Sequence, residues 1–146
     1  MQIALYQPDI PPNTGTILRL CACLDVSAHI IEPAGFAVSD YAFRRAGMDY
    51  LDHVSLMRHV SWDTFEAWRR EAGYRLLLFT TKGATSYLDF RYRAQDILMF
   101  GRETAGVPEE VAAGEAAEHG RTPGMGAFAL KRQEDLLDGV THPISP

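Results

Sequence analysis

The sequence has little cysteine and no metal-binding pattern. Its two cysteines, Cys21 and Cys23, are two residues apart on an expected helix, where such side chains do not face each other, so we exclude a disulfide between them. A zinc site would need two further ligands at suitable spacing. The five histidines are scattered and form no His-Glu-x-x-His pattern, so we expect no metal.

Several common catalytic signatures are also missing. No Gly-x-Gly-x-x-Gly fingerprint follows the first expected strand, which disfavours a standard dinucleotide-binding fold. Lys82 and Gly83 lack the upstream glycine of a Walker loop, and the Gly-x-Ser-x-Gly elbow of hydrolases is absent. The function is therefore not given by a standard nucleotide or hydrolase motif.

Long apolar runs and an excess of basic residues are absent too. No run reaches the roughly 18 residues of a membrane helix, so we expect no membrane partner. A net charge of −5 argues against holding nucleic acid by charge alone, although a structured RNA partner stays open if Arg44, Arg45 and other basic pairs gather into one patch. The apolar start at residues 3–6, with no basic region before it, favours a cytoplasmic protein.

The sequence contains alternating strand and helix patterns over one expected domain, residues 1–146. The alternation predicts an α/β fold with a mostly parallel sheet flanked by helices. We expect strands over 2–6, 28–31, 50–55, 75–79 and 97–100, and helices over 13–24, 39–45 and 61–72. Asn13 or Thr14 would cap the first helix, and a short helix over 133–137 is the one element expected after residue 111.

Two turns that follow strands are the first candidate site. Residues 80–83 and 101–106 would lie side by side if their strands are neighbours. Gly101 and Gly106 would let a ligand approach the backbone, whose N–H and C=O groups can read an adenine or a ribose. The competing interpretation, equally supported, is that these glycines serve only to make tight turns.

Asn13, Thr14 and Arg19 form the second candidate group. Pro11 and Pro12 stiffen the chain before them, and an arginine there suits a phosphate or a developing oxyanion because its planar fork donates two hydrogen bonds. The simpler interpretation is a capped helix with an exposed arginine.

Six stretches together resemble one protein family. They are residues 6–15 (YQPDIPPNTG), 19–22 (RLCA), 29–36 (HIIEPAGF), 44–50 (RRAGMDY), 80–83 (TTKG) and 100–106 (FGRETAG). These motifs closely resemble the tRNA wobble-position (cytidine/uridine-34) ribose 2′-O-methyltransferases of the SPOUT superfamily, over roughly residues 1–110.

The resemblance implies a SPOUT-type α/β fold with a C-terminal trefoil knot, a homodimer, and S-adenosyl-L-methionine bound in the knot. It also implies methyl transfer to the ribose 2′-hydroxyl of nucleotide 34 in the anticodon stem-loop of tRNA. The residues that it marks as cofactor-binding are Phe79, Thr80, Thr81, Gly101 and Gly106, and those that it marks as catalytic are Asn13, Arg19 and Glu103.

Residues 112–146 depart from the family pattern. The Arg-Ser-Leu-Asn-like turn that opens the family's last helix is missing, and residues 121–131 read RTPGMGAFALK instead. We hypothesise a slip in the reading frame near residue 113 or a degenerate tail. Two other functions therefore stay open: a non-catalytic RNA-binding or remnant dimer that has lost cofactor binding, and a nucleotide-binding domain of another reaction that binds ATP.

Overall fold

Strands in this chain form one parallel sheet. The structure is a computed structural model that describes residues 1–45, 49–80, 85–88, 90–113 and 125–129. The strands of these ranges are β1 (Gln2–Tyr6), β2 (Ala28–Ile31), β3 (Leu56–His59), β4 (Arg75–Phe79), β5 (Thr85–Ser86), β6 (Asp96–Phe100) and β7 (Met125–Ala129). Their order is β3-β2-β1-β6-β4-β7-β5, and every pairing is parallel. The expected parallel α/β sheet is confirmed.

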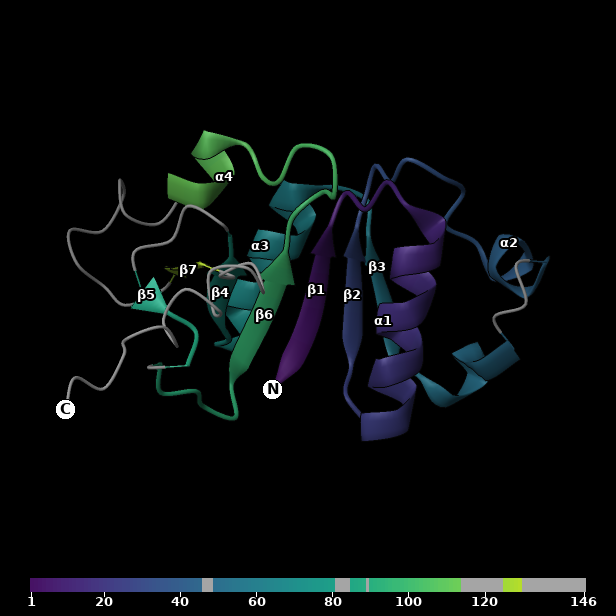
Figure 1. Cartoon of the computed structure of the whole chain (residues 1–146), viewed down its shortest axis with the longest axis horizontal. Coiled ribbons are helices and arrows are strands. Elements are labelled where there is room, and N and C mark those ends of the chain that lie inside the picture. The colour runs from purple at the N-terminus through teal and green to yellow at the C-terminus, as the bar shows by residue number, and fades with distance from the viewer. Residues whose placement is uncertain (46–48, 81–84, 89, 114–124, 130–146) are drawn as a thin grey trace, which may run out of the picture.

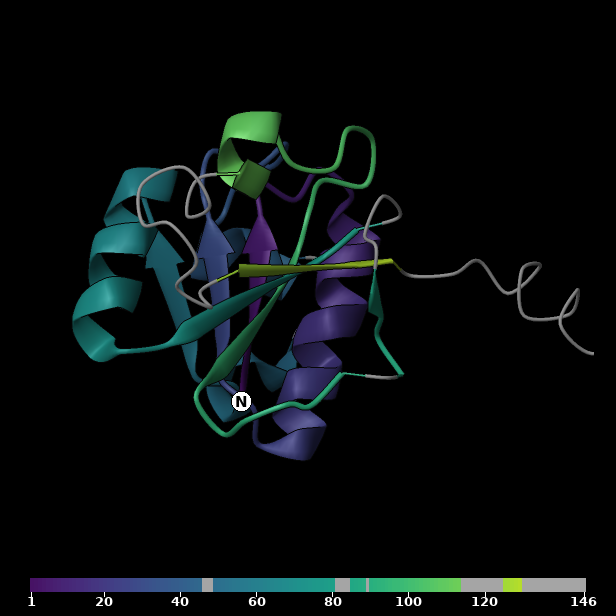
Figure 2. The ribbon, with the colours of Figure 1, turned by 90° about the vertical axis from the view of Figure 1, so that its left-hand side faces the viewer.

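Helices cover both faces of the sheet (Figures 1 and 2). They are α1 (Pro11–Leu24), α2 (Asp40–Arg45), the 3₁₀ helix η1 (Asp49–His53), α3 (Trp62–Ala72) and α4 (Glu109–Ala113). Helix α1 buries Leu18 and Cys21 against Ala28 and Ile30 of β2. Helix α3 lies on the opposite face, where Phe65 packs with residues of β1, β2, β4 and β6. The alternation of inward side chains along each strand produces these two cores.

The third helix begins and ends as its sequence predicts. The Ser61 hydroxyl accepts a hydrogen bond from the backbone N–H of Thr64 at 3.1 Å, which caps the first turn of α3. Gly73 has φ +74°, a left-handed conformation that glycine adopts without a steric cost, and it ends the helix. The expectation of a helix over 61–72 is confirmed.

Two expected boundaries are wrong. Residues 50–55 are not a strand: η1 occupies Asp49–His53 and β3 follows at Leu56–His59. Leu51 and Val54 both pack on the core beneath α1, and side chains three residues apart eclipse on a 3₁₀ helix, so their apolar spacing fits that turn. Helix α1 begins at Pro11 rather than being capped by Asn13 or Thr14, because its N-cap Ile10 makes no side-chain cap and prolines fit the first helical positions.

The strand β7 was missed, because its small residues show no clear periodicity. The short helix expected over 133–137 lies outside the described residues, as does much of the departing tail. The carboxyl ends of β1, β4 and β6 lie at the same edge of the sheet, which is the upper edge in Figure 1. Ligands of open parallel sheets bind beyond this kind of edge.

Candidate active site

The loop that follows β6 is a closed turn. The backbone N–H of Arg102 donates to the carbonyl of Gly106 at 2.9 Å, and the N–H of Gly106 donates to the carbonyl of Arg102 at 2.8 Å. Gly106 has φ +65°, and a Cβ on Gly101 would lie 2.6 Å from the carbonyl carbon of Gly106. Both glycines are therefore required by the turn itself.

A first pocket lies between the ends of β4 and β6, and we call it the β4–β6 pocket. It has a volume of about 260 Å³ and is lined by Leu78, Phe79, Thr80, Phe100, Gly101, Arg102, Glu103, Gly106 and Val107. Four of the five expected cofactor-binding residues thus line one pocket: Phe79, Thr80, Gly101 and Gly106. Thr81 lies outside the described residues. Thr80, the described residue of the first turn, lies beside the second turn, because β4 and β6 are neighbouring strands.

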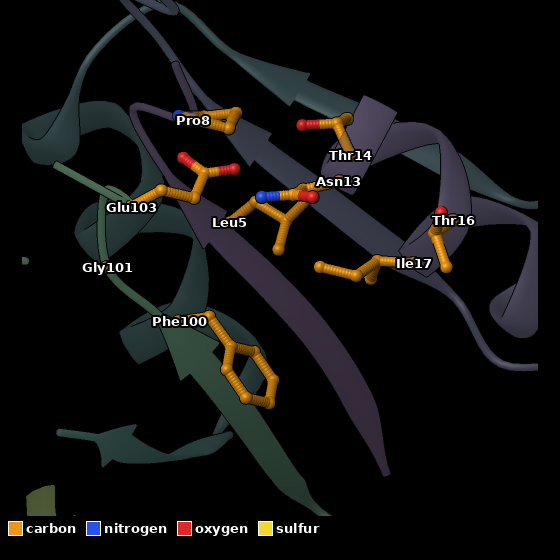
Figure 3. A pocket seen from close by; sticks show the side chains of 9 residues that line it. All are labelled: Leu5, Pro8, Asn13, Thr14, Thr16, Ile17, Phe100, Gly101 and Glu103. Atoms are coloured by element: carbon orange, nitrogen blue, oxygen red, sulfur yellow. The ribbon is translucent and has the colours of Figure 1, made fainter. Parts of the chain in front are cut away.

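A second pocket lies between the start of α1 and the ends of β1 and β6, and we call it the α1 pocket (Figure 3). It has a volume of about 360 Å³ and is lined by Leu5, Pro8, Asn13, Thr14, Thr16, Ile17, Phe100, Gly101 and Glu103. In Figure 3 the Glu103 carboxylate and the Asn13 carboxamide point toward each other across the pocket. The structure therefore brings together two of the three expected catalytic residues.

The two pockets share a wall. Phe100, Gly101 and Glu103 line both of them. Such an arrangement can hold two ligands next to each other, with the end of β6 between them, and proximity of two bound reactants lowers the barrier of a transfer reaction.

Arg19 is not at either pocket. It follows Asn13 by six residues on α1, and at about 100° per residue this places it about 120° around the helix from Asn13. The side chain is exposed, and within the described ranges it makes no hydrogen bond or ion pair. The structure thus separates Arg19 from Asn13 and Glu103 within one chain.

Thr14 is completely buried in the wall of the α1 pocket. Among the described residues its hydroxyl has no hydrogen-bond partner. Buried hydroxyls are usually paired, so an unpaired one at a pocket is a reason to expect a polar ligand there.

Asp9 is a site residue that sequence reasoning missed. Its carboxylate accepts hydrogen bonds from the Glu103 backbone N–H at 3.2 Å and from the Thr104 hydroxyl, and it lies 3.7 Å from Nε of Arg102. Hydrogen bonding with the Glu103 side chain and then with Thr104 lowers the pKa of Asp9 to about 2. Its place in the same segment as Asn13 was the one available sequence signal.

The described ranges hold neither a metal-binding cluster nor a membrane-spanning helix. Nowhere in these ranges do three or more His, Cys, Asp or Glu side chains gather in a way that could ligate a metal. The helices of the same residues include none with the length and apolarity that crossing a bilayer demands.

The comparisons with known proteins agree with the geometry. A profile of the SpoU rRNA Methylase family matches residues 1–120. A tRNA (cytidine(34)-2'-O)-methyltransferase from Beijerinckia indica is 66% identical over 109 residues, which are 75% of this chain and 68% of that protein.

Solved structures show the same fold. One, described as "Structural insights into the 2-OH methylation of C/U34 on tRNA", is 37% identical, has a TM-score of 0.73, and is matched over 90% of this chain and 80% of its own. A putative RNA methyltransferase from Bacillus anthracis is 31% identical, with a TM-score of 0.72 and the same coverage. These matches confirm the family resemblance seen in the motifs: the chain belongs to the SpoU rRNA Methylase family.

Proposed function

We propose that the protein transfers a methyl group from S-adenosylmethionine to the ribose 2′-hydroxyl of nucleotide 34 in the anticodon loop of tRNA. The observation that supports this most is the pair of pockets with a shared wall, in a chain that is 66% identical to a tRNA (cytidine(34)-2'-O)-methyltransferase. One pocket would take the methyl donor and the other the ribose that receives the methyl group.

The β4–β6 pocket fits the donor. Gly101 and Gly106 line this pocket without side chains, so a flat adenine or a ribose could approach the backbone there. Phe79 and Thr80 would line the opposite side, with Thr81 as a further contact. When bound, S-adenosylmethionine supplies a methyl group carried on a positively charged sulfur.

The α1 pocket fits the ribose of the target nucleotide. Leu5, Ile17 and Phe100 provide apolar walls, while Asn13 and Glu103 provide hydrogen-bonding groups on opposite sides. These polar groups would orient the 2′-hydroxyl toward the shared wall. Orientation of the two reactants would then supply much of the rate.

Arg19 would act by its charge rather than as a base. A guanidinium stays protonated in proteins, so it cannot take the proton of the hydroxyl. Its exposed position, outside both pockets of its own chain, suits a contact in a dimer to the ribose or an adjacent phosphate of RNA bound to the second copy, where it would stabilise negative charge that develops on the attacking oxygen.

We further propose a homodimer that acts in the cytoplasm, where its tRNA substrate is found. Leu20 and Leu24 are 52% and 63% exposed on one stripe of α1 that continues from Asn13. Two large apolar side chains at i and i+4 are a natural contact surface for a second copy. Arg19 lies on the adjoining face of the same helix, at the border of such an interface.

Residues 112–146 belong in this proposal as an atypical tail, and the C-terminal knot depends on them. The match to the Beijerinckia indica enzyme covers 109 residues, which are 75% of this chain. A slip in the reading frame near residue 113 predicts that one of the other two frames of the gene encodes a Ser-Leu-Asn-type motif. A degenerate tail predicts that neither does.

Calorimetric titration with S-adenosylmethionine tests the proposal against its alternatives. Binding of this ligand, and not of ATP, is the expected result. No binding at millimolar ligand would favour a remnant RNA-binding dimer, and binding of ATP would favour another reaction. Mass spectrometry of total tRNA from cells with and without the gene should then show loss of a 2′-O-methyl group at position 34 when the gene is absent.

A further inference from the structure

We propose that Asp9 is a positioning residue that fixes Glu103 in the wall between the two pockets. This inference rests on the proposed function, since it assigns a role within that reaction. Asp9 lies in the loop after β1 and Glu103 in the loop after β6, with 94 positions between them in the chain. Asp9 itself lines neither pocket, so any effect on the reaction must pass through the residues that it holds.

The contacts between Asp9 and Glu103 are reciprocal. The backbone N–H of Asp9 donates to Oε2 of Glu103 at 3.0 Å, and the backbone N–H of Glu103 donates to Oδ1 of Asp9 at 3.2 Å. Both the main chain and the carboxylate of Glu103 are therefore held by the same residue. Because the Glu103 carboxylate is the group that faces Asn13 across the α1 pocket, this pair sets where that carboxylate lies.

Two further contacts hold the rest of the loop. The Thr104 hydroxyl donates to Oδ2 of Asp9, and Nε of Arg102 lies 3.7 Å from the same oxygen. Three consecutive residues, 102–104, thus depend on one carboxylate. We call this set of contacts the Asp9 clasp.

The loop after β2 packs closely against Asp9. A Cβ on Gly35 would lie 2.9 Å from both Cα and Cβ of Asp9, and the backbone N–H of Gly35 donates to the carbonyl of Pro8 at 2.8 Å. Only a glycine leaves room for this close approach. The loops after β1, β2 and β6 therefore meet at Asp9, which gives the clasp a fixed base.

The clasp and the closure of the loop are separate. The loop is closed by the backbone pair between Arg102 and Gly106, which does not involve Asp9. Loss of the Asp9 carboxylate should therefore leave the β4–β6 pocket formed but free the loop to shift relative to α1. The expected consequence is a slower transfer step with a nearly unchanged affinity for the methyl donor.

The decisive experiment is a kinetic cycle with Asp9→Ala and Glu103→Gln. In the wild-type background we expect Asp9→Ala to lower kcat about tenfold, because a misplaced group costs a transfer reaction this much, while the Kd for S-adenosylmethionine changes less than about threefold. In the Glu103→Gln background, Asp9→Ala should lower kcat less than about twofold, because the group that it positions is already impaired. Asp9→Glu, which keeps a carboxylate, should recover part of the rate.

Glu71→Ala is a matched control, because Glu71 is an exposed carboxylate on α3 away from both pockets, and it should leave kcat unchanged. Equal factors for Asp9→Ala in both backgrounds would overturn the inference. So would a rise in the Kd for S-adenosylmethionine that matches the fall in kcat.

Amide hydrogen exchange gives a second readout that needs no activity. In Asp9→Ala, the backbone amide of Glu103 should exchange faster, whereas the amide of Gly106 should keep its protection. Unchanged exchange at Glu103 would contradict the clasp. If the wild-type protein transfers no methyl group to tRNA, the proposed function fails, and the exchange result still decides whether Asp9 holds the loop.

Discussion

The rings of Phe79 and Phe100 stack with their centroids 5.1 Å apart and their planes 28° from parallel. The two residues are direct partners in the register of β4 and β6, at the last position of each strand. Phe79 lines the β4–β6 pocket and Phe100 lines both pockets. This stacked pair is a continuous apolar contact between the two candidate binding sites.

The glycine at position 101 should be essential for binding of the methyl donor. In Gly101→Ala, the new Cβ would lie 2.6 Å from the carbonyl carbon of Gly106, so the loop must open. We expect the Kd for S-adenosylmethionine to rise about tenfold or more, as overpacking typically costs 1–3 kcal/mol. Isothermal titration calorimetry measures this. Gly73→Ala, at a positive φ without neighbours, is the control that should leave the Kd unchanged, and an unaltered Kd in Gly101→Ala would refute this role of Gly101.

Arg19 should matter for transfer and not for donor binding. Arg19→Ala removes a charge that would reach the ribose bound by the second copy of a dimer, so we expect methylation to fall steeply, about a hundredfold or more for loss of transition-state stabilisation. Because Arg19 lines neither pocket of its own chain, the Kd for S-adenosylmethionine should stay normal. Arg19→Lys should recover little, because a lysine lacks the two-pronged geometry. Single-turnover methylation and calorimetry separate the two effects. Equal losses of rate and of donor affinity would show that the role of Arg19 is misassigned.

The buried His29–His59 pair should make the protein less stable in acid. Nε2 of His29 lies 2.6 Å from the Gln2 side-chain oxygen, and Nδ1 lies 3.0 Å from Nε2 of His59. Because the amide oxygen can only accept, Nε2 donates and neutral His29 accepts a hydrogen bond from His59. Burial, and then the neighbouring His59, lower the pKa of His29 from 6.5 to about 4.

The sign of this effect follows from the folded state binding fewer protons than the unfolded state. Above pH 6.5 His29 is neutral in both states and does not reduce the free energy of unfolding. As the pH falls from 6.5 toward 4, the unfolded state takes up a proton that the folded state does not, and the free energy of unfolding decreases. Between pH 7.5 and pH 5 the free energy of unfolding should drop by about 2 kcal/mol from this residue. Urea titrations at the two pH values measure it. His53→Ala, an exposed histidine, should preserve the drop; a stability that is flat over this range would contradict the assignment.

The exposed stripe on α1 should hold two copies together. In Leu24→Asp, a charge replaces an apolar side chain that is 63% exposed, so a dimer built on this face should dissociate. We expect the mass in sedimentation equilibrium to fall from that of two chains to that of one. Val60→Asp changes a still more exposed apolar residue, 74% exposed, before α3 and should keep the dimer. A Leu24→Asp protein that remains dimeric would place the interface elsewhere.

The sequence predicts the secondary-structure elements of this protein better than the contacts between them. Strand β4 was predicted from a continuous apolar run, and the two ends of α3 were predicted from Ser61 and Gly73. These signals lie in the same few residues as the structure that they predict. The prediction of a strand over 50–55 was wrong because Leu51 and Val54 pack on the same core, and residues three apart share a face in a 3₁₀ turn but not in a strand. Strand β7 was not predicted because its small residues show no clear hydrophobic periodicity.

The candidate site could be predicted only where it follows from the order of the strands. The turns after β4 and β6 could be expected to meet once their strands were neighbours, and Thr80 and residues 101–103 and 106 do line one pocket. The Asp9 clasp could not be expected, because its partners are 94 and 95 positions away and their pairing depends on how three loops pack. The exposed position of Arg19 could not be predicted, because it depends on which face of α1 packs against the sheet.

Position-resolved methylation of tRNA tests the central claim most directly. The purified protein would be incubated with unmodified tRNA and isotope-labelled S-adenosylmethionine, and the digested RNA mapped by mass spectrometry. The account predicts one labelled methyl group on the ribose of nucleotide 34. Label on a base or at another nucleotide, or no transfer by a protein that binds the donor, would contradict it.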